Sequence, residues 1–333
     1  MPTITLSVGI PTYNQAALLP LAIDSLLKQT RPPDEIVISD HYSTDETPEV
    51  IARYVEQYPQ QIRALKPPHG VNLTGQYNFT LQSQSSDWIS LLSSDDIARP
   101  NFCAILERGA ARETDSVLVR AGWENVDAAG KSVGKNYMLS VSSVERSPVT
   151  LTTQRHGPKV SFAAFALKRA ADMDSGPILE TMESLADWAL FLQMSPFGSF
   201  VYEHALISGY RVGHDGDRFK RRLAMWVRDE QRIFAEVIPL AAKRMGMTNI
   251  TWIAEASRAN FERYLGAAAR DFKPDERGSV TETFMPWAAS VGGEALLENF
   301  RLGGSVASPE TLTQRLRSTI RPLAQEILGR LRR

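Results

Sequence analysis

The chain has 333 residues, with 37 Lys and Arg against 38 Asp and Glu, so its formal net charge is −1 and gives no reason to expect nucleic-acid binding by the whole chain. A hydrophobic content of 43% is that of an ordinary globular protein, and the length suggests about two domains. The single cysteine, Cys103, excludes an intramolecular disulfide framework and favours a cytoplasmic location. We expect neither a signal peptide, because no basic segment precedes the first apolar run, nor a membrane span, because no apolar stretch approaches the ~18 residues required.

The first hundred residues alternate between short apolar runs and helical patterns. The runs predict strands, and the segments between them repeat apolar residues at helical spacing. Strands that alternate with helices at intervals of roughly 20 to 30 residues predict βαβ units and a parallel sheet covered by helices. The predicted strands are 6–10, 34–39, 61–65 and 88–92, and the predicted helices are 18–27, 49–56 and 75–84.

Polar residues follow three of these predicted strands. The run Pro-Thr-Tyr-Asn occupies 11–14, Asp40 follows the second strand, and Asp95 and Asp96 follow the fourth. In open α/β sheets, ligands bind outside the carboxyl ends of the strands. We therefore expect these side chains to meet at one edge of the sheet.

The adjacent carboxylates Asp95 and Asp96 suggest a metal site. Two unit charges ~4 Å apart repel by about 1 kcal/mol in water and by more in a cleft. A hard divalent cation, Mg²⁺ or Mn²⁺, would remove that cost. Successive strand side chains point to opposite faces, so the two carboxylates should have different tasks. The alternative is that Ser94 or Asp95 caps a helix that begins near Pro100.

Three segments together resemble the successive signatures of family 2 glycosyltransferases with the GT-A fold. They are Ile-Pro-Thr-Tyr-Asn at 10–14, Ser-Asp-His-Tyr-Ser-Thr-Asp-Glu-Thr at 39–47 and Leu-Ser-Ser-Asp-Asp at 92–96. The resemblance implies an α/β fold, a Rossmann-like, mostly parallel sheet flanked by helices. It implies a catalytic domain over 1–215, with a nucleotide-sugar half at 1–100 and an acceptor half at 101–215, and a helical region at 216–333.

The resemblance also implies a set of binding residues. Asp95 would lie on the ribose side, and Asp96 would contact Mn²⁺ or Mg²⁺. A carboxylate at position 40 can accept a hydrogen bond from the imide N–H of uracil or thymine, which favours UDP or dTDP donors. The implied nucleotide-sugar contacts are Pro11, Thr12, Tyr13, Asn14, Asp40, Ser43, Asp95 and Arg211, and the implied metal ligands are Asp96 and His214.

Two departures from the family pattern weaken the protein's own hold on a metal. His41 stands where the second Asp after strand two is usual, and Ser93 or Ser94 where a leading Asp often lies. With fewer carboxylates, the nucleoside diphosphate must supply most of the metal ligands. His214 is open to a second interpretation, because a lone histidine is more often structural than ligating.

A second acidic element lies downstream, at 180–192, where an acidic turn leads into an apolar helix. It resembles the family's Glu-Asp-Trp element, whose Asp is the general base of inverting enzymes, a role worth ~10²–10⁴ in rate. This assigns the base to Asp187, with Glu183 as the nearest rival. The alternative is that Asp187 only caps the helix that carries Trp188.

The chain from 117 to 214 should complete the sheet. Residues 117–120, 199–202 and 207–214 predict strands, and 123–130 predicts a hairpin whose Trp123 either stacks on a sugar or packs in the core.

Beyond residue 215 the pattern is helical. We expect helices at 223–245 and 251–272 and a linker at 273–278. The segment 308–333 repeats apolar residues at helical spacing, carries six Arg against two Glu, a charge of +4, and should kink at Pro322. Such a helix either lies on anionic lipid, at the inner face of the cell membrane, or packs on the catalytic domain or the partner of a homodimer.

The sequence therefore predicts a metal-dependent inverting glycosyltransferase. It would move a sugar from a nucleoside-diphosphate donor to a hydroxyl of a glycan or lipid-linked acceptor, in surface polysaccharide synthesis. A dinucleotide oxidoreductase would need G-x-G-x-x-G after the first strand, and a nucleotidyltransferase a Gly-rich basic loop there; 11–14 provides neither. A non-catalytic sugar-nucleotide-binding or scaffold protein on the same fold remains the alternative.

Overall fold

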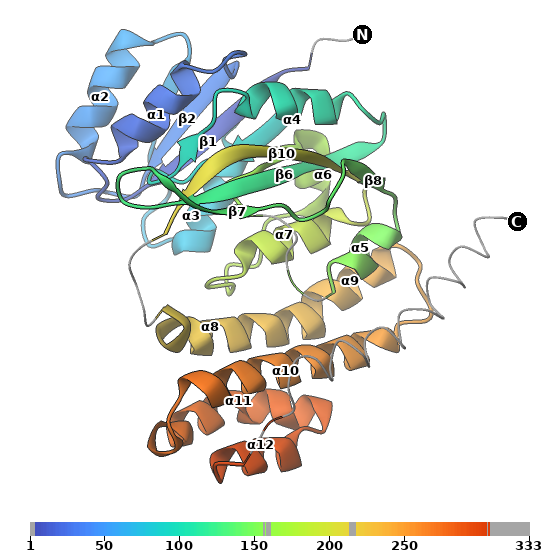
Figure 1. The fold of residues 1–333 in the computed structure, drawn as a ribbon. Coiled ribbons are helices and arrows are strands. Elements are labelled where there is room, and N and C mark those ends of the chain that lie inside the picture. Colours follow the sequence, from blue (N-terminus) through green and yellow to red (C-terminus); the bar gives the residue numbers. More distant parts are fainter. Residues whose placement is uncertain (1–3, 156, 158–160, 213–217, 305, 307–333) are drawn as a thin grey trace, which may run out of the picture. The chain divides into compact units, whose positions relative to one another are not determined.

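The computed structural model describes residues 4–155, 157, 161–212, 218–304 and 306 (Figure 1). The chain divides into two compact units, one of Met1–Gly216 with Glu236–Thr248 and one of Asp217–Ala235 with Asn249–Arg333. The expected domain boundary at 215 and 216 falls outside the described residues, as do His214 and the basic segment 308–333. None of the helices in the described ranges combines the length and apolar character needed to cross a membrane.

A single mixed sheet of ten strands organises the described part of the first unit. Its main path runs in the order β3-β2-β1-β4-β9-β6-β10-β5, with β7 beside β6 and β8 beside β10. The strands are β1 Leu6–Thr12, β2 Glu35–Asp40, β3 Ile62–Leu65, β4 Trp88–Leu91, β5 Ile97–Ala98, β6 Ser116–Val126, β7 Ser132–Asn136, β8 Ser143–Glu145, β9 Phe165–Lys168 and β10 Ser199–Arg211.

The first four strands, β1 to β4, are parallel, as the alternating pattern predicts. Every residue of β1 is buried, which agrees with a continuous apolar run covered on both faces. Helices α1 (Leu19–Leu27) and α4 (Phe102–Ala110) share one apolar core with β1 and β2. Helix α3 (Leu73–Gln82) contacts β1, β2 and β4, and α2 (Thr47–Gln57) follows β2.

The second half of the sheet departs from parallel order. Strand β9 lies antiparallel between β4 and β6, whereas β6 and the long β10 run parallel. The predicted hairpin is confirmed, since β7 pairs antiparallel with β6. Trp123 is partly buried and packs against the main core, as the core-packing interpretation predicts. The remaining helices of this unit are α5 Val149–Thr153, α6 Arg169–Ser175, α7 Ala186–Met194 and α9 Ile238–Arg244.

The second unit is helical in its described residues. Its helices are α8 (Arg218–Arg232), α10 (Trp252–Asp271), α11 (Arg277–Val291) and α12 (Glu294–Arg301), around a core that includes Phe261, Phe284 and Trp287. The linker predicted at 273–278 is wrong in part, because a 3₁₀ turn at Pro274–Glu276 leads directly into α11.

The residues predicted as one helix at 223–245 are helical up to Arg244, but they do not form a single regular α-helix. A π-helical turn at Ile233–Val237 separates α8 from α9, and the two helices belong to different units. Pro239 lies in the first turn of α9 and has no amide hydrogen to donate to the preceding turn, so the regular helix is interrupted there.

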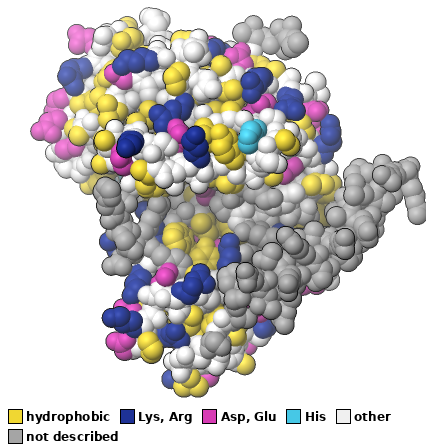
Figure 2. All heavy atoms as spheres, viewed as in Figure 1, with side chains coloured by type: hydrophobic (Ala, Val, Ile, Leu, Met, Phe, Trp, Pro, Cys, Tyr) yellow, Lys and Arg dark blue, Asp and Glu magenta, His cyan; other side chains and the backbone are white. Residues whose placement is uncertain are grey.

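On the face of the first unit shown in Figure 2, acidic and basic side chains are interspersed. The mixture agrees with a formal net charge near zero. This face therefore presents no broad surface of one charge sign that would attract a charged ligand.

Gly9 lets α3 approach β1 closely. A Cβ at this position would lie 2.5 Å from Thr80 Cγ2 and 2.9 Å from Gln84 Nε2. We expect Gly9→Ala to lower the free energy of unfolding by about 1–3 kcal/mol, because the core must shift to accept the methyl group. Urea unfolding measures this.

Gly134→Ala is the control. A Cβ at Gly134 on β7 would meet its nearest atom at 3.7 Å, an ordinary contact. An equal loss in both variants would contradict the close approach at Gly9 and point to strand propensity alone.

Candidate active site

The polar residues predicted at strand ends lie at one edge of the sheet. Thr12, the last residue of β1, is paired in register with Asp40, the last residue of β2. Strand β1 lies between β2 and β4, and the segment after β4 carries Asp95 and Asp96. The edge thus has Asp40 on one side of β1 and the two adjacent carboxylates on the other.

The loops after β1 and β2 are tied together by Asn14 and Ser43. The Asn14 backbone is left-handed, with φ of 50°, and its N–H donates to the Ser43 hydroxyl at 2.9 Å. The Asn14 side-chain oxygen accepts the Thr44 N–H at 2.8 Å, and the Asp40 carboxylate accepts the Ser43 N–H at 3.0 Å. Both predicted contact residues therefore shape the loops that surround Asp40.

At the ends of β1 and β2, three buried oxygens have no hydrogen-bond partner among the described residues: Thr12 Oγ1, Ser39 Oγ and Asp40 Oδ2. The Lys66 ammonium lies 3.8 Å from Asp40 Oδ2, beyond hydrogen-bond range. A buried carboxylate oxygen without a partner is costly. A ligand that donates a hydrogen bond there would remove that cost.

A cavity of about 210 Å³ adjoins Asp40. Its walls are mostly apolar, from Pro48 and Ile51 on one side and Ala64 and Leu65 on the other, with Lys66 at the rim. The Tyr13 ring, 54% exposed, meets His41 edge to face at 6.2 Å. An apolar slot with one carboxylate and exposed rings nearby is suited to a flat heterocycle with an N–H donor.

Asp95 and Asp96 do not cap α4. The short strand β5 separates them from that helix, and Asn101, the cap residue, makes no side-chain cap bond. The capping alternative is therefore wrong. Asp96 is buried, with one carboxylate oxygen accepting the Arg211 N–H at 2.8 Å and the other, Oδ2, lacking a partner among the described residues.

Burial raises the pKa of Asp96 well above its usual range, and the neighbouring Asp95 adds to the effect. Burial also raises the pKa of Asp95, although the Arg211 charge partly offsets it. Two desolvated carboxyls beside each other favour either protons or a bound cation.

The donor set fits a cation that is held only in part by protein. In the described ranges no three His, Cys, Asp or Glu side chains come together as a complete cage. The unpartnered Oδ2 of Asp96 can supply one hard oxygen ligand, and Mg²⁺ is commonly held by one or two carboxylates plus substrate phosphates. The other predicted ligand, His214, lies outside the described residues.

The guanidinium of Arg211 is hydrogen-bonded to backbone carbonyls. It donates to the carbonyl of Asp95 at 2.8 Å and to those of Asp127 and Ala128 at 2.8 and 2.6 Å. It therefore joins the turn after β6 to the segment that carries the carboxylates. The predicted diphosphate contact stays a prediction, and the observed bonds give Arg211 a positioning role.

Helix α3 connects the two halves of the site. The buried Gln76 amide donates to the carbonyls of Thr12 and Ser39, at 3.1 and 2.9 Å, where β1 and β2 end. On the same helix, the Thr74 hydroxyl donates to the Met182 carbonyl at 2.6 Å. Asn78 donates to the Ile178 carbonyl at 2.8 Å and accepts the Ile178 N–H at 2.9 Å. The segment before α7 is thus bound to α3.

Asp187 lies half-buried in the first turn of α7, where its carboxylate accepts the Trp188 N–H at 2.7 Å. Trp188 is fully buried, and its indole donates to the Gln154 carbonyl at 2.8 Å. The tryptophan therefore has a core role. Asp187 lies inside the first turn and is not the cap of α7, because the cap position is Leu185, so the capping alternative is wrong and the role as general base stays a prediction. The rival Glu183 is exposed.

The sequence reasoning missed Tyr77 on α3. Burial raises the pKa of its phenol, and the charge of Asp187 raises it further, followed by those of Asp95 and Asp96. The charges of all three predicted carboxylates thus act on one phenol. No pattern in the sequence marks this tyrosine, because its role depends on groups that are distant along the chain.

We expect Thr74→Val to loosen the segment before α7. The change keeps the shape of the side chain but leaves the buried Met182 carbonyl without its donor, at a cost of about 1–3 kcal/mol. Urea unfolding measures the loss, and hydrogen–deuterium exchange of a peptide spanning 178–185 should rise.

The matched control is Thr80→Val, whose hydroxyl bonds only to Gln76 within the helix. Equal exchange of 178–185 in the two variants would contradict the role assigned to Thr74.

Comparison with known proteins agrees with this geometry. The family model for glycosyl transferase family 2 matches residues 7–174, which is just over half of the chain. The chain is 24% identical over 242 residues to a hyaluronan synthase of Pasteurella multocida, covering 73% of this chain and only 23% of that relative. The chain thus spans about a quarter of the length of that relative.

Solved structures show the same fold. The structure of S. aureus TarS 1–349 in complex with UDP-GlcNAc has a TM-score of 0.54 and 14% identity, covering 90% of this chain and 93% of that one. The mannosyltransferase PcManGT from Pyrobaculum calidifontis, in complex with GDP-Man and Mn²⁺, has a TM-score of 0.53 and 16% identity, covering 89% and 86%. These findings confirm the predicted GT-A fold. The chain belongs to glycosyl transferase family 2.

Proposed function

We propose that this chain is a metal-dependent, inverting glycosyltransferase that moves one sugar from a nucleoside diphosphate to a hydroxyl of a glycan or lipid-linked acceptor. The observation that carries the proposal is the position of Asp95 and the buried Asp96 after β4, at the sheet edge where β1 and β2 end, with Asp96 Oδ2 unpartnered among the described residues. Asp187 lies in α7, and the segment before α7 is bound to α3.

The donor base is assigned to the cavity beside Asp40. The unpartnered Oδ2 of this buried carboxylate can accept the imide N–H of uracil or thymine, which cytosine lacks. UDP and dTDP donors are therefore favoured over cytidine-linked donors. TarS was solved with UDP-GlcNAc, which supports this assignment, whereas PcManGT was solved with GDP-Man.

Asp96 would hold Mn²⁺ or Mg²⁺ through Oδ2, and the diphosphate would complete the coordination. When bound, the metal supplies positive charge that stabilises the departing nucleoside diphosphate. The chain's own contribution is orientation, because the Arg211 N–H fixes the other oxygen of Asp96. Asp95, on the ribose side, would hold the sugar hydroxyls of the nucleoside.

Asp187 would act as the general base. As the acceptor oxygen attacks the anomeric carbon, its proton passes to the Asp187 carboxylate. The bond from that carbon to the diphosphate breaks with its electron pair on the diphosphate. Attack opposite the leaving group inverts the anomeric configuration.

For the acceptor, we propose a chemical class only, a glycan or a lipid-linked glycan. A relative named hyaluronan synthase supports a growing polysaccharide as acceptor. Contact with the inner face of the cell membrane, or with a second copy of the chain, would depend on 308–333, which lies outside the described residues. A sugar-nucleotide-binding or scaffold protein is the second candidate, favoured by His41 and Ser93 at positions where carboxylates are usual.

A thermal-shift screen of UDP, dTDP, GDP and CMP, with and without Mn²⁺, tests the donor and metal assignments together. Ligand at ~100 Kd should stabilise the protein by about 2.7 kcal/mol. We expect UDP or dTDP to stabilise the wild type only with Mn²⁺, and Asp96→Asn to lose that gain. The quantity compared between wild type and Asp96→Asn is the difference in melting temperature with and without ligand. Removing a buried charge also changes the melting temperature of the variant without ligand.

Asp174→Asn, on an exposed site of α6, is the control and should keep the full ligand shift. A metal-independent shift of the same size in Asp96→Asn would contradict the metal assignment. Failure of all four nucleotides to bind would contradict the enzyme proposal.

Asp187→Asn tests the base. We expect sugar transfer to fall by ~10²–10⁴, with the nucleotide-induced thermal shift retained, because only the proton acceptor is lost. Glu183→Gln should transfer sugar at close to the wild-type rate. Near-wild-type turnover by Asp187→Asn, or a larger loss of sugar transfer in Glu183→Gln, would contradict the assignment of Asp187 as the general base.

A further inference from the structure

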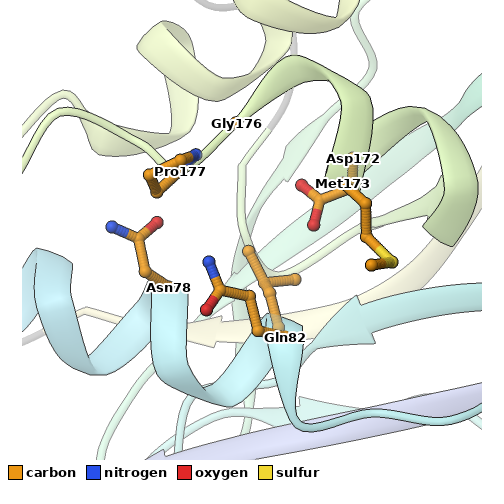
Figure 3. Close-up of a pocket in the computed structure, with 7 residues that line it drawn as sticks. Asn78, Gln82, Asp172, Met173, Gly176 and Pro177 are labelled. Atoms are coloured by element: carbon orange, nitrogen blue, oxygen red, sulfur yellow. The ribbon is translucent and has the colours of Figure 1, made fainter.

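A second cavity, of about 230 Å³, lies outside the site described above. Its lining comes from Asn78, Leu81 and Gln82 of α3 and from Asp172, Met173 and Pro177 of α6 and the turn after it (Figure 3). None of the residues assigned above to the donor, the metal or the general base lines it.

Asp172 is the unusual member of this lining. It is only 7% exposed, and within the described part of the chain its carboxylate has neither a hydrogen bond nor an ion pair. Figure 3 shows the carboxylate turned toward the space between α6 and α3. Burial raises the pKa of this carboxyl to about 6, and the charge of Arg169 offsets the effect only in part. Among the described residues, the charge of Arg169 is therefore the compensation for the burial of this group, and it is incomplete.

The rest of the lining divides into polar and apolar parts. The Asn78 amide is held by its two bonds to Ile178, which leaves one N–H and one lone pair of that amide for a ligand. Gln82 adds a second, exposed amide. Leu81, Met173 and Pro177 supply apolar surface, and the Met173 side chain is 62% exposed.

This combination fits a saccharide better than other ligands. A carboxylate accepts hydrogen bonds from two adjacent hydroxyls, amides can donate and accept, and apolar side chains pack on the C–H face of a sugar ring. A divalent cation would need more oxygen ligands than one carboxylate provides.

We propose that the cavity between α3 and α6 is a saccharide subsite, in which Asp172 accepts hydrogen bonds from neighbouring hydroxyls of one sugar unit. Asn78 lines the cavity and also forms the hydrogen bonds to Ile178 that hold the segment leading to Asp187. A sugar bound there would therefore contact the helix that holds the segment leading to Asp187. That this sugar is a unit of the acceptor chain rests on the proposed function; that the cavity binds a saccharide does not.

Saturation-transfer NMR on the full chain, without nucleotide or metal, tests the subsite. The probes are glucose, galactose, N-acetylglucosamine, glucuronate and the β-linked disaccharides of these sugars. We expect at least one probe to receive saturation from the wild type, and its affinity to fall at least tenfold in Asp172→Asn. Asp174→Asn, which removes the same charge from an exposed position of the same helix, should bind like the wild type.

Met173→Ala provides a second variant that leaves the fold intact, because the side chain is mostly exposed. It should weaken the same probe. Unchanged binding in Asp172→Asn, displacement of the probe by UDP with Mn²⁺, or no binding by any probe would overturn the proposal. Tighter binding of ethylammonium than of any sugar would overturn it in favour of a cationic ligand. The nucleotide thermal shift, measured on the same samples, reports separately on the proposed function.

Discussion

The buried amide of Gln76 is the contact on which the arrangement of the site depends. It donates to two main-chain carbonyls at the ends of β1 and β2, and those strand ends carry the loops of the donor site. The Thr12 carbonyl also accepts the His41 N–H at 2.9 Å. A hydrogen bond of this kind contributes about 0.5–1.5 kcal/mol, so the two Gln76 bonds together favour this placement of the strand ends. The glutamine comes from a helix that follows β3, yet it sets the geometry of the two strands before it.

The same helix also determines where the second half of the site lies. Thr74 and Asn78 bind the main chain of the segment that leads into α7, and Asn72 donates to the Glu180 carbonyl at 2.6 Å. Gly9 permits the close packing of α3 on β1 that brings these side chains within reach. The separation between the carboxylates after β4 and Asp187 is thus set by one helix that touches both. A small displacement of α3 would change donor and acceptor geometry together.

Local patterns were enough to predict the parallel half of the sheet. Apolar runs and helical spacing are read within short windows, and parallel strands oblige Asp40 and Asp95 to share an edge. The insertion of β9 between β4 and β6 was beyond such reasoning, because its partners lie far away in the chain. The roles of Arg211 and Tyr77 were missed for the same reason: each depends on contacts with residues distant in sequence.

The electrostatics of the carboxylate pair support the metal site proposed above, although the site has few acidic residues. Asp96 is held from one side by a backbone N–H, and Arg211 anchors the Asp95 carbonyl, so both groups are positioned before any ligand arrives. Burial makes their charged forms costly, and no described cation pairs directly with Asp96 Oδ2. The carboxylates are thus held in place while the charge of Asp96 stays uncompensated by the described residues. A bound cation would stabilise that charge. With His41 and Ser93 where carboxylates are usual, a cation alone would find too few ligands. A cation that arrives with a diphosphate would bring the missing oxygens, so metal and donor should bind as one unit.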